Sequence, residues 1–149
     1  MPMKFRWLMP AFFAGIAGLT SCEKKETVPQ DAFSFKVDGM AYNANQIFTE
    51  IIDTAGKKAL IVDGVSNNFV NHQELIVFFP DVIKPGTNTR ASLTLMNIKQ
   101  EGVGYITSTL TVNITSINSK YAEGTFTGTL TSGETEKPLT DGTFKVYIH

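Results

Sequence analysis

The sequence predicts an all-β fold: an antiparallel β-sandwich of roughly eight to ten short strands, with a closed up-and-down β-barrel as the alternative. Three observations lead to this prediction. Apolar and polar residues alternate through the C-terminal third of the chain, which is the period of a half-buried strand. An Asp-Gly pair at residues 38–39 stands between two alternating runs, which is a strong hairpin signal. No segment shows a convincing 3.6-residue repeat, and short strands joined by tight turns make a sandwich or a barrel.

Residues 1–21 have the layout of a bacterial lipoprotein signal peptide. Lys4 and Arg6 precede an apolar stretch, and small residues then lead to Cys22, the single cysteine. The stretch of about 13 residues is too short to cross a membrane, which takes about 20. Resemblance to such signals implies cleavage before Cys22 and acylation of both its thiol and its new amino group. Two or more acyl chains hold a protein stably in a membrane.

Residues 22–32 are charged and contain Pro29, so we expect a short lipidated tether, followed by a single β-domain at residues 33–149. Acylation of Cys22 leaves the mature domain without a thiol, which excludes disulfides and cysteine chemistry. Loss of residues 1–21 lowers the Lys and Arg count from 13 to 11 against 14 Asp and Glu, so the net charge changes from −1 to −3. A mildly acidic domain without a basic cluster in its sequence is a poor candidate for binding nucleic acid or anionic membrane surfaces.

The first strands are predicted from local signals. The alternating runs 33–37 and 40–44 flank Asp38-Gly39, and a type I′ turn there would pair Val37 with Met40.

A second hairpin is expected between residues 47–52 and 59–65, across residues 53–58. The run 74–79 is apolar on both sides and predicts a central strand covered on both faces. Residues 84–87, Lys-Pro-Gly-Thr, fit a type II turn.

Five further strands are expected, at residues 92–98, 103–107, 110–115, 125–130 and 143–148. The last three have one apolar and one threonine-rich face, so the sheet should be antiparallel with one wet side. Gly124 and Gly128 lie inside a predicted strand and indicate bulges or a close approach of backbone.

Two motifs resemble small lipoproteins of the Bacteroidota. The opening segment 33–39 matches F-x-x-x-V-D-G, and residues 124–126 and 142–144, both Gly-Thr-Phe, match a closing pair of G-x-F strands. The resemblance covers nearly all of the mature chain, although Tyr42 stands where that family frequently has tryptophan. It implies a lipid-anchored single β-domain of unknown function, with no assigned catalytic residues.

The residues suited to chemistry are few. His72 is expected in a polar loop and His149 ends the chain, and neither has the spacing of metal ligands. The G-x-S-x-G element of serine hydrolases is missing from the sequence, and the carboxylates are spread singly over predicted turns and strand ends. The sequence therefore predicts no catalytic site, no metal site and no cofactor.

One modification is predicted. Asp53-Thr54-Ala55 resembles the D-[ST]-apolar site of general O-glycosylation in exported Bacteroidota proteins. Thr54 is therefore the candidate O-glycosylation site, and an unmodified turn is the alternative.

These observations predict a cell-envelope lipoprotein, anchored by its lipid in the outer membrane and serving as a non-enzymatic binding or accessory module. The threonine-rich face and the loops 67–73 and 132–141 are the expected contact surfaces. Periplasmic retention and surface display both stay open, as does a protein or glycan partner.

The main alternative is a lipocalin- or avidin-like barrel that carries a small apolar ligand inside. A filled core would oppose this alternative, and an internal pocket of about 300 Å³ or more would favour it. A hydrolase with dispersed carboxylates is a third hypothesis.

Overall fold

The computed structural model describes residues 30–98 and 104–149, so the expected signal peptide, Cys22 and most of the tether lie outside the described residues. Within these ranges the strands are β1 Ala32–Val37, β2 Met40–Thr54, β3 Lys57–Ser66, β4 Asn71–Phe79, β5 Gly86–Asn88, β6 Ala91–Asn97, β7 Gly104–Ile117, β8 Tyr121–Ser132 and β9 Thr135–Tyr147. The described ranges include no helix with the length and apolar character needed to span a bilayer.

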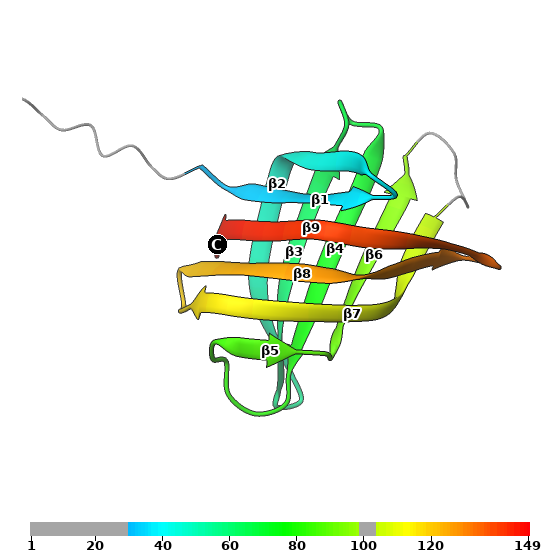
Figure 1. Ribbon diagram of the computed structural model, residues 1–149. Helices are drawn as coiled ribbons and strands as arrows, with labels where there is room; N and C mark the ends of the chain where they lie inside the picture. The colour runs from blue at the N-terminus through cyan, green and yellow to red at the C-terminus, as the bar shows by residue number, and fades with distance from the viewer. Residues whose placement is uncertain (1–29, 99–103) are drawn as a thin grey trace, which may run out of the picture.

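Eight of the strands form a closed antiparallel barrel (Figure 1). Strands β1, β2, β3, β4, β6, β7, β8 and β9 each pair with their neighbours in this order. The ring closes because β9 returns to β1, with Phe144 opposite Phe33. The short strand β5 lies outside the ring and pairs with β7.

The sandwich prediction is therefore wrong, and the alternative, an up-and-down barrel, is confirmed. Alternation of apolar and polar residues is the same in both folds, and the pairing of β1 with β9 decides between them. Several strands are also long rather than short, since β2 has 15 residues and β7 has 14.

Bulges let the long strands bend around the barrel. Strand β2 pairs with β1 through Asn43 and then with β3, and its register shifts between Ala44 and Gln46. A bulge sharpens the bend and twist of a strand. As a result β1, β7, β8 and β9 cross β3, β4 and β6 at a steep angle (Figure 1).

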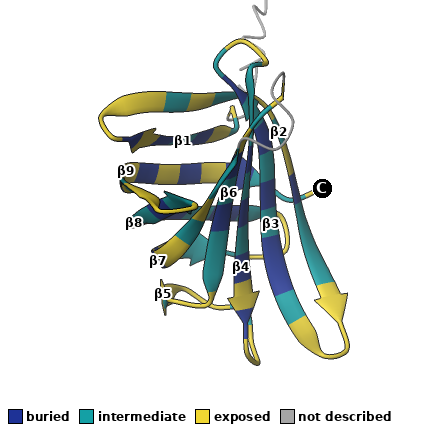
Figure 2. Cartoon of the chain, turned by 90° about the vertical axis from the view of Figure 1, so that its right-hand side faces the viewer, coloured by how far each residue is buried: buried dark blue, intermediate teal, exposed yellow. Residues whose placement is uncertain are grey.

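Side chains fill the inside of the barrel. Buried and exposed positions alternate along the strands (Figure 2). The rings of Phe33 and Phe35 both lie about 6 Å from the ring of Phe126, at 6.0 and 5.9 Å between centroids. The largest fully buried side chains include Phe33, Phe35, Phe126, Phe144, Leu60, Leu75, Leu93, Ile114, Leu130 and Leu139.

The two N-terminal hairpins both have two-residue turns. The first has the predicted register, and φ is 50° at Asp38 and 81° at Gly39, as a type I′ turn requires. The second is tighter than predicted: Thr54 pairs with Lys57, and the turn is Ala55-Gly56 with φ of 55° and 74°.

Several expected loops are strands instead. The turn after β3 ends at residue 70, so His72 lies in β4. Residues 132–141 belong mostly to the β8–β9 hairpin, which turns at residues 133–134. Gly86 has the positive φ expected of it, but at 139° it begins β5 instead of occupying the third position of a type II turn, where φ is near 80°.

Two further expectations need correction. The strand predicted at residues 103–107 is the first part of β7, and Val103 itself lies outside the described residues. Strand β4 is not covered on both faces within the described chain, because Phe78 on its outer face is 45% exposed. The threonine-rich outer face is confirmed, with Thr111, Thr125 and Thr143 exposed.

Candidate functional site

The two ends of the barrel are made by different turns. At one end the described chain enters β1, and we call it the entry end; it comprises residues 30–32, 55–56, 80–90, 118–120 and 148–149, with the strand ends next to them. The C-terminus lies beside the start of β1 (Figure 1). The opposite end, called the far end, comprises the turns 38–39, 67–70 and 133–134, with the strand ends next to them.

An apolar recess of about 420 Å³ opens at the entry end. Four isoleucines from separate segments line it, and its remaining lining residues are Asn118, Ser119 and His149. These isoleucines, all half-buried, are Ile51 of β2, Ile83 of the connection after β4, Ile117 of β7 and Ile148. We call this cavity the isoleucine recess.

Backbone hydrogen bonds hold the C-terminal side of this recess in place. The amide of Ile148 donates to the carbonyl oxygen of Lys120 over 2.9 Å, and the amide of His149 donates to that of Thr49 over 3.0 Å. The last residues therefore extend the line of β9 past its end and close one side of the recess.

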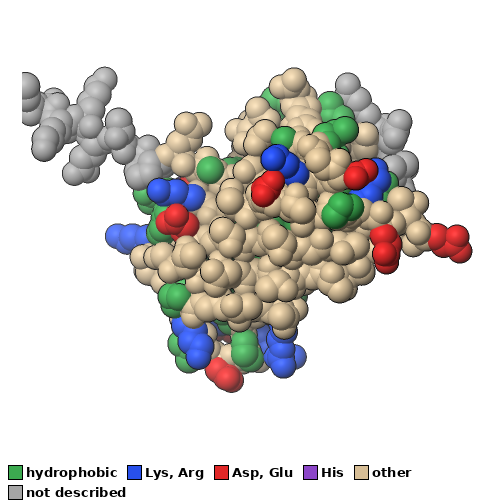
Figure 3. Space-filling model, in the orientation of Figure 1, with side chains coloured by type: hydrophobic (Ala, Val, Ile, Leu, Met, Phe, Trp, Pro, Cys, Tyr) green, Lys and Arg blue, Asp and Glu red, His purple; other side chains and the backbone are tan. Residues whose placement is uncertain are grey.

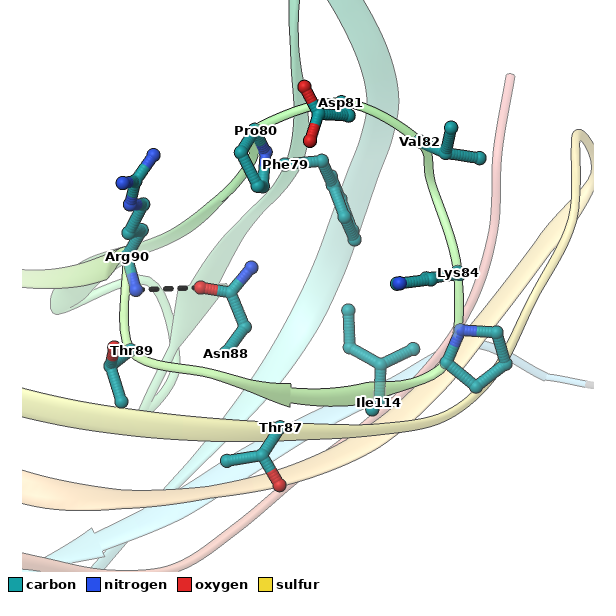
Figure 4. Close-up of a pocket in the computed structure, with 12 residues that line it drawn as sticks. Phe79, Pro80, Asp81, Val82, Lys84, Thr87, Asn88, Thr89, Arg90 and Ile114 are labelled. Carbon is teal, nitrogen blue, oxygen red and sulfur yellow. Dashed lines mark hydrogen bonds between the residues drawn. The ribbon is translucent and has the colours of Figure 1, made fainter.

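A second pocket, of about 480 Å³, lies inside the connection 80–90, and we call it the loop pocket. Phe79 and Ile114 are buried at its base, being only 4% and 2% exposed. The amino group of Lys84 points into the ring formed by the connection (Figure 4). The loop pocket thus combines an apolar base with one cation.

Asn88 holds the two ends of this connection together. Its amide nitrogen donates to the carbonyl oxygen of Phe78 over 2.7 Å, and its side-chain oxygen accepts from the amide of Arg90 over 2.6 Å (Figure 4). The amide of Phe78 also donates to the carbonyl oxygen of Arg90 over 2.8 Å. The connection is therefore a compact loop with a fixed neck.

Both cavities have the size and character of sites for small molecules. Such sites usually enclose about 300–1,000 Å³ and combine apolar walls with a few polar groups. The isoleucine recess suits an apolar body, and Lys84 in the loop pocket suits an anionic group. Val82 and Ile83, adjacent in the chain, line different pockets, so the connection separates the two.

His72 has a partner that the sequence did not indicate. Its Nε2 lies 2.5 Å from Oδ1 of Asp63 on the neighbouring strand, and both side chains are 37% exposed. The register also puts Glu74 opposite Asp63, so these two carboxylates are not isolated at turns as expected. A His–Asp pair is only two thirds of a hydrolytic triad, and no hydroxyl of the described residues donates to His72.

The remaining predicted sites are placed as follows. Thr54 is exposed and is the last residue of β2, beside the Ala55-Gly56 turn. Cys22 lies outside the described residues. In the described ranges, no three His, Cys, Asp or Glu side chains are grouped in a way that would hold a metal ion.

Sequence reasoning missed both pockets. The isoleucines of the recess lie up to 97 positions apart, from Ile51 to Ile148, and become neighbours only when the barrel closes. The one signal in the sequence was the stretch with Pro80 and Pro85, which marked a connection too irregular for a hairpin turn.

Comparison with known proteins adds no relative: no family model, no curated protein and no solved structure matches the chain. The resemblance to small Bacteroidota lipoproteins stays a prediction from the sequence.

Proposed function

We propose that the chain is a membrane-anchored bacterial lipoprotein that acts as a non-enzymatic binding module, with its ligand site in the isoleucine recess. The observation that carries the proposal is the convergence of four isoleucines from separate segments on a recess of about 420 Å³. Burying an apolar group of a ligand there would release it from water, at roughly 25 cal/mol per Å² of apolar surface.

The ligand class follows from the lining. The walls are aliphatic, so the bound part of the ligand should be apolar and small. Asn118, Ser119 and the C-terminal His149 supply the polar groups at the recess, and these would orient a polar end of the ligand by hydrogen bonds.

A second candidate function is a carrier with its ligand inside the barrel, as in lipocalin- or avidin-like proteins. The up-and-down closure favours it, because that topology is shared with such carriers. The filled interior opposes it, because four buried phenylalanines occupy the space that a ligand would need. The recess at the mouth of the barrel is therefore the better supported site.

Fluorescence titration of the full chain with an apolar dye such as ANS tests the site. Ile83→Ser should weaken dye binding by about tenfold, because fully burying an isoleucine is worth about 1.5–3 kcal/mol. Ile83 is half-buried, lies on a connection and packs against the core from outside it, so this change leaves every buried core side chain in place.

Val82→Ser is the matched control, since Val82 is 67% exposed and borders the loop pocket instead. It should leave dye affinity unchanged. A larger loss from Val82→Ser than from Ile83→Ser would assign the dye to the loop pocket and contradict the proposed site.

A further inference from the structure

Basic side chains gather at the entry end of the barrel. Five cations lie there: Lys84 and Arg90 in the connection 80–90, Lys120 in the connection 118–120, and Lys57 and Lys58 at the start of β3. None of the five forms an ion pair within the described chain. The carboxylates of this end are Asp31, Asp53 and Asp81; Asp53 lies opposite Lys58 in the β2–β3 pair, and Asp31 accepts a hydrogen bond from the amide of Tyr147 over 2.8 Å. Near the same end Glu123 of β8 lies opposite Lys145 of β9, so these two charges offset each other. The entry end therefore carries a surplus of unpaired positive charge.

The far end has the opposite character. Lys36 is paired with Asp141 over 3.0 Å, and Lys137 lies over the ring of Tyr105, 5.1 Å from its centroid. The carboxylates of Asp38, Glu134 and Glu136 also belong to this end. In Figure 3 basic side chains are prominent along the left and lower edges, with acidic ones beside them, and acidic side chains are prominent at the right. The chain is acidic as a whole, and yet one end is basic.

We infer that the entry end docks on an anionic lipid surface, an inference that rests on the proposed anchoring at Cys22. Nine residues lie between Cys22 and Ala32, and the ten steps along the chain span at most about 35 Å when extended. An acylated Cys22 would thus hold the basic end, rather than the acidic end, close to the membrane. Val82, 67% exposed on the connection that carries Lys84, offers an apolar side chain to the interface.

The expected strength follows from the number of cations. A lysine or arginine near an anionic membrane surface contributes about 1 kcal/mol, which is about fivefold in the docking equilibrium. The tether adds to this effect, since a short linker gives an effective concentration of order millimolar. Docking in this orientation would turn the isoleucine recess and the loop pocket toward the lipid.

The test uses the full lipidated chain reconstituted in vesicles, with one engineered cysteine carrying an environment-sensitive dye. Ser119→Cys labels the entry end and Thr135→Cys labels the far end, and both sites are exposed. With vesicles containing phosphatidylglycerol, lipid-borne quenchers should reach the dye at residue 119 but not at residue 135. With vesicles of pure phosphatidylcholine, or at about 1 M salt where the Debye length is about 3 Å, the difference in quenching between the two labels should vanish.

Paired charge variants complete the test. Lys57→Gln with Lys120→Gln should lower the ratio of docked to undocked molecules about 25-fold, which is fivefold for each cation. Lys36→Gln with Lys137→Gln removes as many charges from the far end and should leave the ratio unchanged. Equal quenching at both labels, equal quenching in neutral vesicles, or equal effects of the two double variants would each overturn the inference.

A separate control tests the lipid anchor at Cys22 independently of the docking. The lipidated chain without an engineered cysteine, the parent chain, should take up no dye, because its one thiol, on Cys22, would be acylated. Labelling of the parent, or failure to float with phosphatidylcholine vesicles, would refute the anchor. Normal flotation without the difference between the labels would refute the docking alone.

Discussion

The ring of Phe144 covers Gly124 across the β8–β9 pair, where the two residues are direct partners. A Cβ atom on Gly124 would lie 2.6 Å from Cζ of that ring. The relation is reciprocal, because Phe126 lies opposite Gly142 and a Cβ there would be 2.4 Å from the Phe126 ring. In the two Gly-Thr-Phe segments, each phenylalanine ring therefore lies over the glycine of the other segment, inside the core.

Alanine at either glycine should therefore destabilise the barrel. We expect Gly124→Ala and Gly142→Ala each to cost about 1–3 kcal/mol in the free energy of unfolding, the usual range for overpacking a core. Urea denaturation measures the change. Gly104→Ala is the control, since its Cβ would meet Met96 at an ordinary 3.4 Å. Equal losses at all three positions would argue against this packing of rings over glycines.

The turn at Ala55 offers a stabilising change. Ala55 has φ of 55°, a left-handed conformation that costs an L-residue roughly 1–2 kcal/mol. Ala55→Asn makes the Asn-Gly pair that type I′ turns prefer and should raise the free energy of unfolding by up to about 1 kcal/mol, because asparagine takes up the left-handed conformation at lower cost than alanine. Ala41→Asn, at an exposed position inside β2, should give no gain. A stability unchanged by Ala55→Asn would contradict this account of the turn.

Tyr121 should titrate unusually late. Burial, and then the hydrogen bond that its hydroxyl donates to Glu123 over 2.6 Å, raise the pKa of Tyr121 to about 12 from an ordinary 10.0. Between these two values the unfolded chain would lose the proton and the folded chain would keep it, so Tyr121's contribution to stability falls as the pH rises from 10 to 12.

An ultraviolet titration of phenolate absorbance checks this value. Glu123→Gln removes the negative charge but not the burial, so the pKa of Tyr121 should fall only part of the way toward 10.0. Tyr121→Phe should remove the late-titrating component altogether. A titration of Tyr121 near 10 in the unmodified chain would be inconsistent with its observed surroundings.

Thr54 is exposed and accessible to a glycosyltransferase. If the Asp53-Thr54-Ala55 segment is an O-glycosylation site, the peptide that contains Thr54, from protein made in its native host, should exceed its sequence mass by a glycan, and Thr54→Val should remove the difference. Thr127→Val, at an exposed threonine that follows Phe126 rather than an aspartate, should not. A Thr54 peptide without added mass would contradict the modification.

The local parts of this fold could be predicted from the sequence, and its closure could not. The register of the Asp38-Gly39 hairpin follows from two neighbouring residues that take up positive φ. The pairing of Phe33 with Phe144 joins the two ends of the domain, and residues so far apart give no periodic signal.

Separation along the sequence also explains why the isoleucine recess was not predicted. The isoleucines of the recess come from four segments that meet only in the folded barrel. The net charge of the sequence likewise gave no hint of a basic end, because its five cations come from three segments that are distant in the sequence. His72 was expected in a loop because its polar neighbours resemble turn residues, and pairing with β3 and β6 makes it part of a strand instead.

Mass spectrometry of the N-terminal peptide from the native membrane fraction tests the central claim most directly. Mature bacterial lipoproteins begin at the modified cysteine. The account therefore predicts that Cys22 is the first residue and carries acyl chains on its sulfur and its amino group. A free thiol on Cys22, or a chain that still begins at Met1, would contradict it.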